Sequence, residues 1–159
     1  MSLMRALAFG SVLAILGPAT VLTAQGTDRA IGSWKLDVAK SKYELSPMPK
    51  SLIVTYEKAG QGLKVSTKGV DGQGNPTTTG YTANYDGKDN PAMGGPDYDM
   101  VSLMQTDAST VQITRKKGGK VVATLQRVVS ADGKVLTITT TGTNAKGQPA
   151  KDVGVFEKQ

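Results

Sequence analysis

The feature that most constrains this chain is an alternation of apolar and polar residues with a period of two, which continues from residue 32 to residue 157. Such alternation is typical of β-strands with one buried face, and stretches with helical periodicity are scarce. The pattern predicts nine strands, at residues 32–36, 51–58, 63–70, 77–85, 100–105, 110–116, 121–130, 135–141 and 151–157. We therefore expect an all-β protein.

The segments between these strands are short and rich in Gly, Asp and Asn, for example GQG at 60–62, GG at 118–119 and DG at 132–133. These residue types tolerate the left-handed backbone conformation that hairpin turns of about two to five residues require. Successive hairpins build an antiparallel up-and-down meander, and closing the meander into a barrel removes both exposed edges. The sequence thus predicts a closed antiparallel barrel of eight or nine strands.

One segment of the sequence is repeated at an offset of 73 residues. LKVSTKGVDGQGNP at 63–76 and LTITTTGTNAKGQP at 136–149 are identical at five of fourteen positions. A duplicated strand-hairpin-strand unit and independently acquired turn chemistry explain this likeness equally well. Either origin predicts the same plan of strand and turn in the two segments.

The first 24 residues have the order of features found in a secretory signal peptide. Arg5 precedes an apolar run at 6–16, and small residues lead up to Ala24. The run is shorter than the ~20 apolar residues of a membrane span. Cleavage is expected after Ala24, with Ala19 as the alternative site. We therefore expect residues 1–24 to be a signal peptide, residues 25–159 to form the barrel domain, and the mature protein to be periplasmic or secreted.

The chain contains neither Cys nor His. It therefore lacks disulfides, thiolate zinc sites and every catalytic triad that uses an imidazole base. No Ser lies near a Lys in a tight strand-to-helix turn, the arrangement that a Ser-Lys nucleophile would need. The four carboxylates between Asp86 and Asp99 do not have EF-hand spacing, so turns or a flexible lid are expected there rather than a calcium site. The sequence predicts a protein that is not an enzyme and holds no cofactor or metal.

Two short motifs resemble the calycin superfamily, which comprises the lipocalins and the fatty-acid-binding proteins. GSWKL at 32–36 is similar to the G-x-W motif that opens these barrels, and VFEKQ at 155–159 is similar to the closing strand of the fatty-acid-binding branch. GSWKL followed by AKSKY at 39–43 also resembles small exported lipocalin-like proteins of bacteria with no assigned activity. The resemblance implies a lipocalin-like barrel in which Gly32 and Trp34 are structural and Trp34 plugs the closed end under a basic side chain.

The resemblance also implies a function, namely an exported protein that binds a small hydrophobic or amphipathic molecule. A packed structural or interaction domain of the bacterial envelope, without a small-molecule ligand, is the alternative, because small barrels often fill with their own side chains. The chain departs from fatty-acid-binding proteins at their R-x-Y motif, which holds the ligand carboxylate. Gly154 and Phe156 stand at the matching positions. Residues 37–50 also have room for one short helix instead of two.

Without the R-x-Y motif, affinity is expected to come mainly from burial of apolar surface, so neutral lipophiles should bind at least as well as fatty acids. Arg115 and Arg127 alternate in phase with apolar neighbours. Each is predicted either to point into the barrel, as a carboxylate clamp or a cover for Trp34, or to lie at the rim. The predicted ligand-binding residues are Tyr56, Tyr81, Leu103, Ile113, Arg115, Arg127, Ile138 and Phe156.

A basic cluster, RKKGGK at 115–120, forms the tip of one predicted hairpin. Isolated charge runs are usually solvated turns, and that interpretation is favoured. A weak contact of Lys116, Lys117 and Lys120 with an anionic membrane surface is the alternative, since each cation adds on the order of 1 kcal/mol there. No aromatic residues interleave with these lysines, so nucleic-acid binding is not expected.

Overall fold

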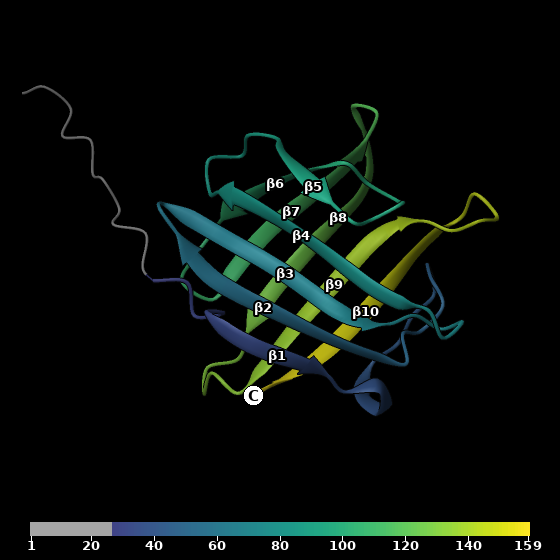
Figure 1. The fold of residues 1–159 in the computed structure, drawn as a ribbon, viewed down its shortest axis with the longest axis horizontal. Coiled ribbons are helices and arrows are strands. Elements are labelled where there is room, and N and C mark those ends of the chain that lie inside the picture. Colours follow the sequence, from purple (N-terminus) through teal and green to yellow (C-terminus); the bar gives the residue numbers. More distant parts are fainter. Residues whose placement is uncertain (1–26) are drawn as a thin grey trace, which may run out of the picture.

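The computed structural model describes residues 27–159, which form a closed antiparallel barrel of ten strands (Figure 1). Each strand pairs with its neighbours in sequence, and β1 closes the barrel by pairing with β10. The strands are β1 (Gly32–Leu36), β2 (Ser51–Ala59), β3 (Gly62–Val70), β4 (Pro76–Asn84), β5 (Asn90–Met93), β6 (Met100–Gln105), β7 (Thr110–Lys117), β8 (Lys120–Val129), β9 (Val135–Thr143) and β10 (Pro149–Lys158). The predicted signal peptide and its cleavage site lie outside the described residues.

The all-β meander closed into a barrel is confirmed, and the expected count of eight or nine strands is corrected to ten. All nine predicted strands are present, with ends that differ by at most two residues. The additional strand is β5, which lies in the stretch expected to be a loop or lid. β5 has only two register pairs with β4 and two with β6. Its four residues include Pro91, which cannot donate to a ladder, so the segment carries no strand signal.

Trp34 fills one end of the barrel, which we call the closed end. It has no exposed surface, and its Nε1 donates to the carbonyl oxygen of Ala30 at 2.7 Å. The cation over its ring is Lys158, whose Nζ lies 5.3 Å from the ring centroid. The expectation that Arg115 or Arg127 covers Trp34 is wrong, because Trp34 pairs in register with Lys158 where β1 meets β10.

Gly32 has a structural role at the same end of the barrel. Its backbone has φ of +125°, a conformation that a residue with a side chain rarely adopts. A Cβ atom at this position would also meet Lys158 Cε at 3.4 Å. Gly32 therefore lets β1 start beside the lysine that covers Trp34.

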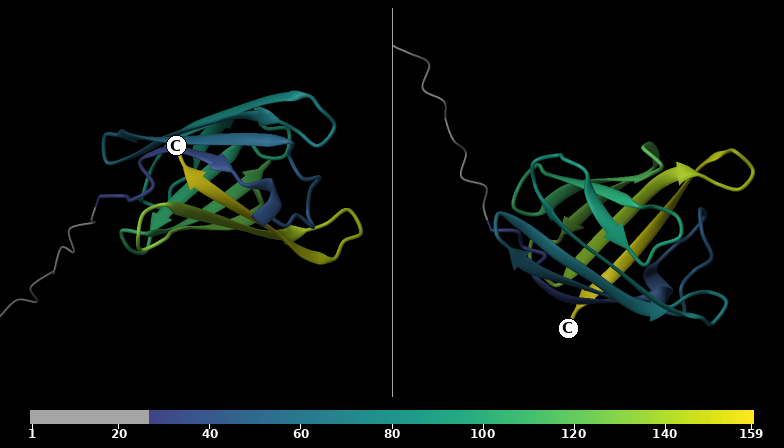
Figure 2. Two further views of the ribbon diagram at one scale, coloured as in Figure 1. Left: turned by 90° about the horizontal axis from the view of Figure 1, so that it is seen from below. Right: turned by 45° about the horizontal axis from the view of Figure 1, so that its top comes forward.

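Residues 37–50 cross from β1 to β2 and lie beside β10 (Figure 2). Within them, η1 (Val38–Lys40) is a single 3-10 turn, so the expected limit of one short helix is confirmed. Asp152 on β10 fastens the segment: Oδ1 accepts from the amides of Glu44 and Leu45 at 2.7 Å each, and Oδ2 accepts from Ser46 Oγ at 2.8 Å. Within residues 27–159, no helix is long and apolar enough to span a membrane.

The two repeated segments have the same turn. The turns begin at Asp71 and Asn144, and in each the Oδ1 atom accepts from the amides two and four residues further along the chain. Gly74 and Gly147 occupy equivalent positions with positive φ. The predicted common plan of strand and turn is therefore confirmed.

Candidate functional site

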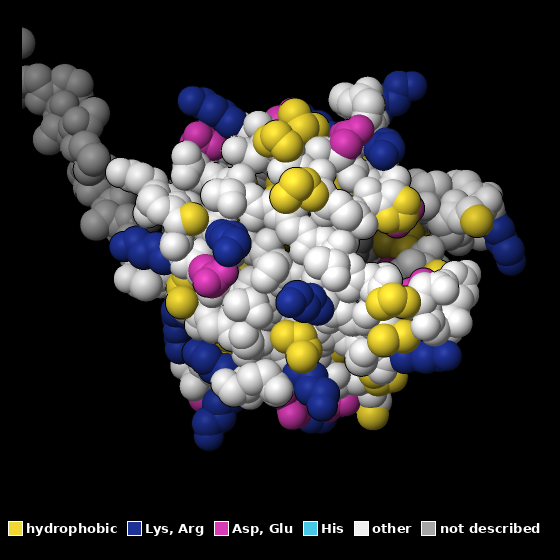
Figure 3. Space-filling model, viewed as in Figure 1, with side chains coloured by type: hydrophobic (Ala, Val, Ile, Leu, Met, Phe, Trp, Pro, Cys, Tyr) yellow, Lys and Arg dark blue, Asp and Glu magenta, His cyan; other side chains and the backbone are white. Residues whose placement is uncertain are grey.

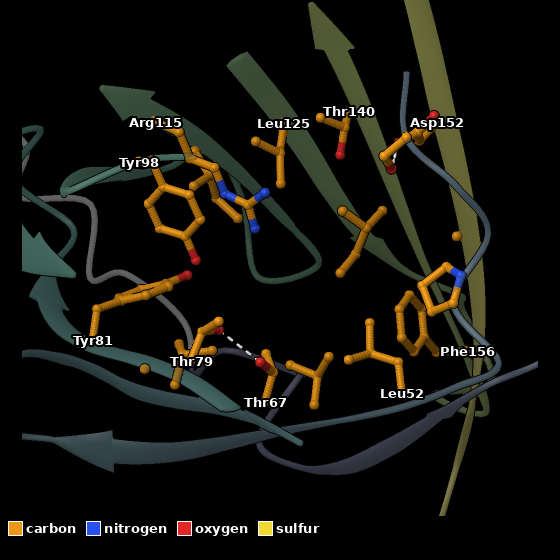
Figure 4. A pocket seen from close by; sticks show the side chains of 18 of the residues that line it. Leu52, Thr67, Thr79, Tyr81, Tyr98, Arg115, Leu125, Thr140, Asp152 and Phe156 are labelled. Atoms are coloured by element: carbon orange, nitrogen blue, oxygen red, sulfur yellow. Dashed lines mark hydrogen bonds between the residues drawn. The ribbon is translucent and has the colours of Figure 1, made fainter. Parts of the chain in front are cut away.

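A cavity of about 210 Å³ lies inside the barrel, between β-strands and the 37–50 segment (Figure 4). Its apolar wall comes from the inward faces of several strands and includes Leu52, Val54, Val65, Ile113, Leu125, Ile138 and Phe156. The lining is also rich in hydroxyl groups, from Tyr43, Ser46, Tyr56, Thr67, Thr79, Tyr81, Tyr98 and Thr140. Two charged side chains, Arg115 and Asp152, complete the lining.

Six of the eight predicted ligand-binding residues line this cavity, namely Tyr56, Tyr81, Ile113, Arg115, Ile138 and Phe156. Two do not. Leu103 is 1% exposed and packs into the apolar core, and Arg127 is held at the closed end by an ion pair. Both point inward, as their phase predicted, but neighbouring side chains fill the barrel around them. The binding role of the six that line the cavity stays a prediction.

Arg127 is buried and paired. Its Nη2 forms an ion pair with Asp28 Oδ2, and the two side chains are only 1% and 3% exposed. Asp28 also accepts from Tyr85 Oη and from the Ala30 amide. The guanidinium lies 4.7 Å from the ring centroid of Tyr56. Burial by itself would lower the pKa of Arg127, but its anionic and phenolic neighbours hold the pKa above its ordinary value. Arg127 is therefore a structural cation.

Arg115 is half-buried and points into the cavity (Figure 4). Its guanidinium carbon lies 4.4 Å from the ring centroid of Tyr98, a cation-π distance. Its Nε is buried and has no hydrogen-bond partner, and none of the ion pairs among residues 27–159 includes Arg115. The cavity therefore contains a positive charge that no carboxylate of this part of the chain neutralises.

Two tyrosines of the cavity, Tyr43 and Tyr81, have raised pKa values. Burial raises the pKa of Tyr43 to about 12, Asp152 adds to the rise, and Arg115 opposes it. Burial likewise raises the pKa of Tyr81, and the charge of Arg115 again acts in the opposite direction. These phenols can each donate a hydrogen bond into the cavity.

Gly154 and Phe156, which replace the R-x-Y motif, both face the cavity. A Cβ atom at position 154 would lie 2.8 Å from the Phe156 ring and 3.1 Å from Tyr43 Oη. The missing side chain at Gly154 is therefore what allows the Phe156 ring and the Tyr43 hydroxyl to occupy this wall. Strand β10 contributes apolar surface here in place of a cation.

Several lining residues were missed by sequence reasoning, for two different reasons. Thr67, Thr79 and Asp152 are in phase with inward-facing neighbours, so alternation marks them, but the only polar residues predicted to bind the ligand were tyrosines and arginines. Tyr43 and Tyr98 lie outside the long strands, where no periodicity indicates direction. Only the tertiary structure brings these two tyrosines to the cavity.

The basic hairpin tip is partly neutralised by the 86–99 stretch. Lys116 Nζ donates to Asp89 Oδ2 at 2.7 Å, and the amide of Gly118 donates to Asp99 Oδ2 at 3.1 Å. Lys117 and Lys120 are exposed. Lys and Arg side chains are spread across the visible face rather than gathered into one patch (Figure 3). Among the described residues, no group of three His, Cys, Asp or Glu is arranged to hold a metal ion.

Comparison with known proteins identifies the fold. No family model matches the sequence, and no curated protein is significantly similar to it. Among solved structures, the zebrafish ileal bile acid-binding protein in complex with cholic acid is similar, with a TM-score of 0.52 and 14% sequence identity over 83% of this chain and 100% of that chain. The closed antiparallel barrel, opened by a G-x-W strand whose tryptophan seals one end, therefore has the calycin fold that the sequence motifs predicted.

Proposed function

We propose that this protein binds a small hydrophobic or amphipathic molecule in the barrel cavity and is not an enzyme. The observation that carries the proposal is the cavity itself, about 210 Å³ of space in a barrel whose closed end is fully packed. A purely structural barrel would be expected to fill this space with its own side chains. The similar zebrafish protein is named for binding a bile acid, which is consistent with this role.

The lining matches an amphipathic ligand. Apolar side chains from β2, β7, β9 and β10 offer surface whose burial contributes ~25 cal/mol per Å². Hydroxyl groups and one guanidinium without a carboxylate partner in the described chain offer directional contacts within the same lining. Small-molecule sites usually combine apolar surface with a few polar groups, and in this cavity polar residues make up a larger share of the lining than usual.

We also propose that the protein is exported and that its signal peptide is removed. Cleavage after either Ala19 or Ala24 would leave Asp28 in the mature protein, where it neutralises Arg127. Amino-terminal sequencing of the protein from its native host is the test. A mature terminus near residue 25 is expected, and an intact Met1 on secreted protein would contradict export.

Blocking the cavity tests the binding function. Thr140 lines the cavity, whereas Thr141, the next residue on β9, is exposed on the outer face. Octanamide, an uncharged amphipathic probe, is titrated into the protein while amide resonances are followed by NMR. Thr140→Phe should weaken binding at least tenfold, and the matched control Thr141→Phe should leave it unchanged.

Two outcomes would contradict this proposal. If the wild-type protein binds neither octanamide nor any copurifying lipophile detected by mass spectrometry, the packed structural alternative holds. If Thr140→Phe and Thr141→Phe bind equally well, the ligand lies elsewhere. Thermal unfolding shows whether Thr140→Phe is folded, and Thr140→Ser, which keeps the hydroxyl group and adds no bulk, should retain binding.

A further inference from the structure

Arg115 stands apart from the other charged groups inside the barrel. Arg127 forms an ion pair with Asp28, and both carboxylate oxygens of Asp152 accept hydrogen bonds from residues 44–46. Arg115 has only the face of the Tyr98 ring, and its buried Nε has no partner within residues 27–159. A charge withdrawn from water without a counter-charge is costly, so an anion that enters the cavity gains an unusually strong partner.

Asp152 is not the counter-charge of Arg115. It lies on β10, and the register places β8 and β9 between it and β7, which carries Arg115. Three strand spacings correspond to about 14 Å across the sheet. Figure 4 shows Leu125 and Thr140 between the two side chains. The positive charge therefore stays concentrated at one side of the cavity.

Two phenols extend the polar site around Arg115. Tyr81 and Tyr98 line the same part of the cavity, and their hydroxyl groups point toward one another beneath the guanidinium in Figure 4. Neither hydroxyl bonds to another residue in the described part of the chain. A guanidinium fork with two free phenol donors matches the geometry of a carboxylate or sulfonate.

We infer that the ligand is a compact organic anion whose charged head binds Arg115, Tyr81 and Tyr98, with its apolar part on Leu52, Ile138 and Phe156. The inference rests on the proposed function and specifies its ligand class. It revises the sequence-based expectation that neutral lipophiles bind at least as well as acids. The size limit follows from the volume, since about 210 Å³ is smaller than the ~300–1,000 Å³ of pockets for drug-sized molecules.

The test compares octanoate with octanamide, which has the same length and an uncharged head, by isothermal titration at neutral pH. Octanoate should bind the wild-type protein at least tenfold more tightly. Arg115→Met should remove this difference while leaving octanamide affinity within about twofold. Lys117→Met is the matched control, because it removes one exposed cation of the same strand, and the tenfold preference should persist in it.

The possible failures are distinguishable. Binding of both probes with equal affinity overturns the inference and leaves the proposed function intact, whereas binding of neither contradicts the proposed function. A preference for octanoate that survives Arg115→Met assigns the anion to another site and also overturns the inference. If Arg115→Met does not fold, Arg115→Lys serves instead and should reduce the preference without abolishing it. Hexadecanoate binding more than tenfold tighter than octanoate would overturn the size limit.

Discussion

Two arginines on adjacent strands, Arg127 at the closed end and Arg115 in the cavity, have the same chemistry and opposite situations. Each guanidinium lies over a tyrosine ring, at 4.7 Å for Arg127 and 4.4 Å for Arg115. Arg127 is almost fully buried and paired with Asp28, whereas Arg115 is half-buried and has no carboxylate partner in the described chain. The comparison teaches that the neighbouring charge decides whether a buried cation stabilises the fold or remains available to a ligand.

The largest expected effect comes from removing the counter-charge at the closed end. Asp28→Ala should lower the free energy of unfolding by about 3–5 kcal/mol, because it leaves Arg127 buried without a partner. Urea unfolding monitored by tryptophan fluorescence measures this change. In the double variant Asp28→Leu with Arg127→Met, most of the stability should return. A loss below about 1 kcal/mol in Asp28→Ala would show that Arg127 does not depend on this carboxylate.

Truncating Trp34, which fills the same end of the barrel, should lower the free energy of unfolding by a similar amount. Trp34→Ala should cost about 3–5 kcal/mol, the range for truncation of a large buried aromatic side chain. Chemical denaturation followed by circular dichroism measures the loss, since the variant has no tryptophan. Trp34→Phe, which keeps a ring, should lose less. A cost below about 1 kcal/mol for Trp34→Ala would contradict the closed end described above.

The stability of the protein at alkaline pH tests whether the 37–50 segment, which contains Tyr43, covers the cavity. Burial raises the folded-state pKa of Tyr43 from 10.0 to about 12. Its contribution to stability is therefore complete below pH 10 and is lost as the pH rises from 10 to 12, because the unfolded chain ionises first. Between pH 10 and 12, the free energy of unfolding of the Tyr43→Phe variant should fall by about 2 kcal/mol less than that of the wild type. Identical pH dependence in the two proteins would mean that the 37–50 segment does not cover the cavity.

The smallest effect is expected at Arg115. Arg115→Met should change the free energy of unfolding by no more than about 1 kcal/mol, because the lost cation-π contact is offset by removal of an uncompensated charge. Urea unfolding of both proteins without added ligand provides the comparison. A loss near that of Asp28→Ala would show that Arg115 is also structural, and the contrast between the two arginines would disappear.

The sequence predicted the barrel wall well and the interior only partly. Nine strands and their turns follow from alternation and from Gly, Asp and Asn at the turns, both of which are local properties. β5 was missed because a four-residue strand containing Pro91 has no pattern. Alternation also indicated that Arg115 and Arg127 face inward, but it did not predict which residues each arginine contacts.

By itself, the sequence determined the all-β meander, the closed barrel and the placement of Trp34 in its core. Only the tertiary structure decided which cation covers Trp34, which arginine is neutralised and where the cavity lies. The physical reason is sequence distance. Asp28 and Arg127 are 99 residues apart, and Arg115 remains unpaired because the register places three strand spacings between it and Asp152. Local periodicity fixes the face on which a side chain lies, whereas barrel closure and register fix its neighbours.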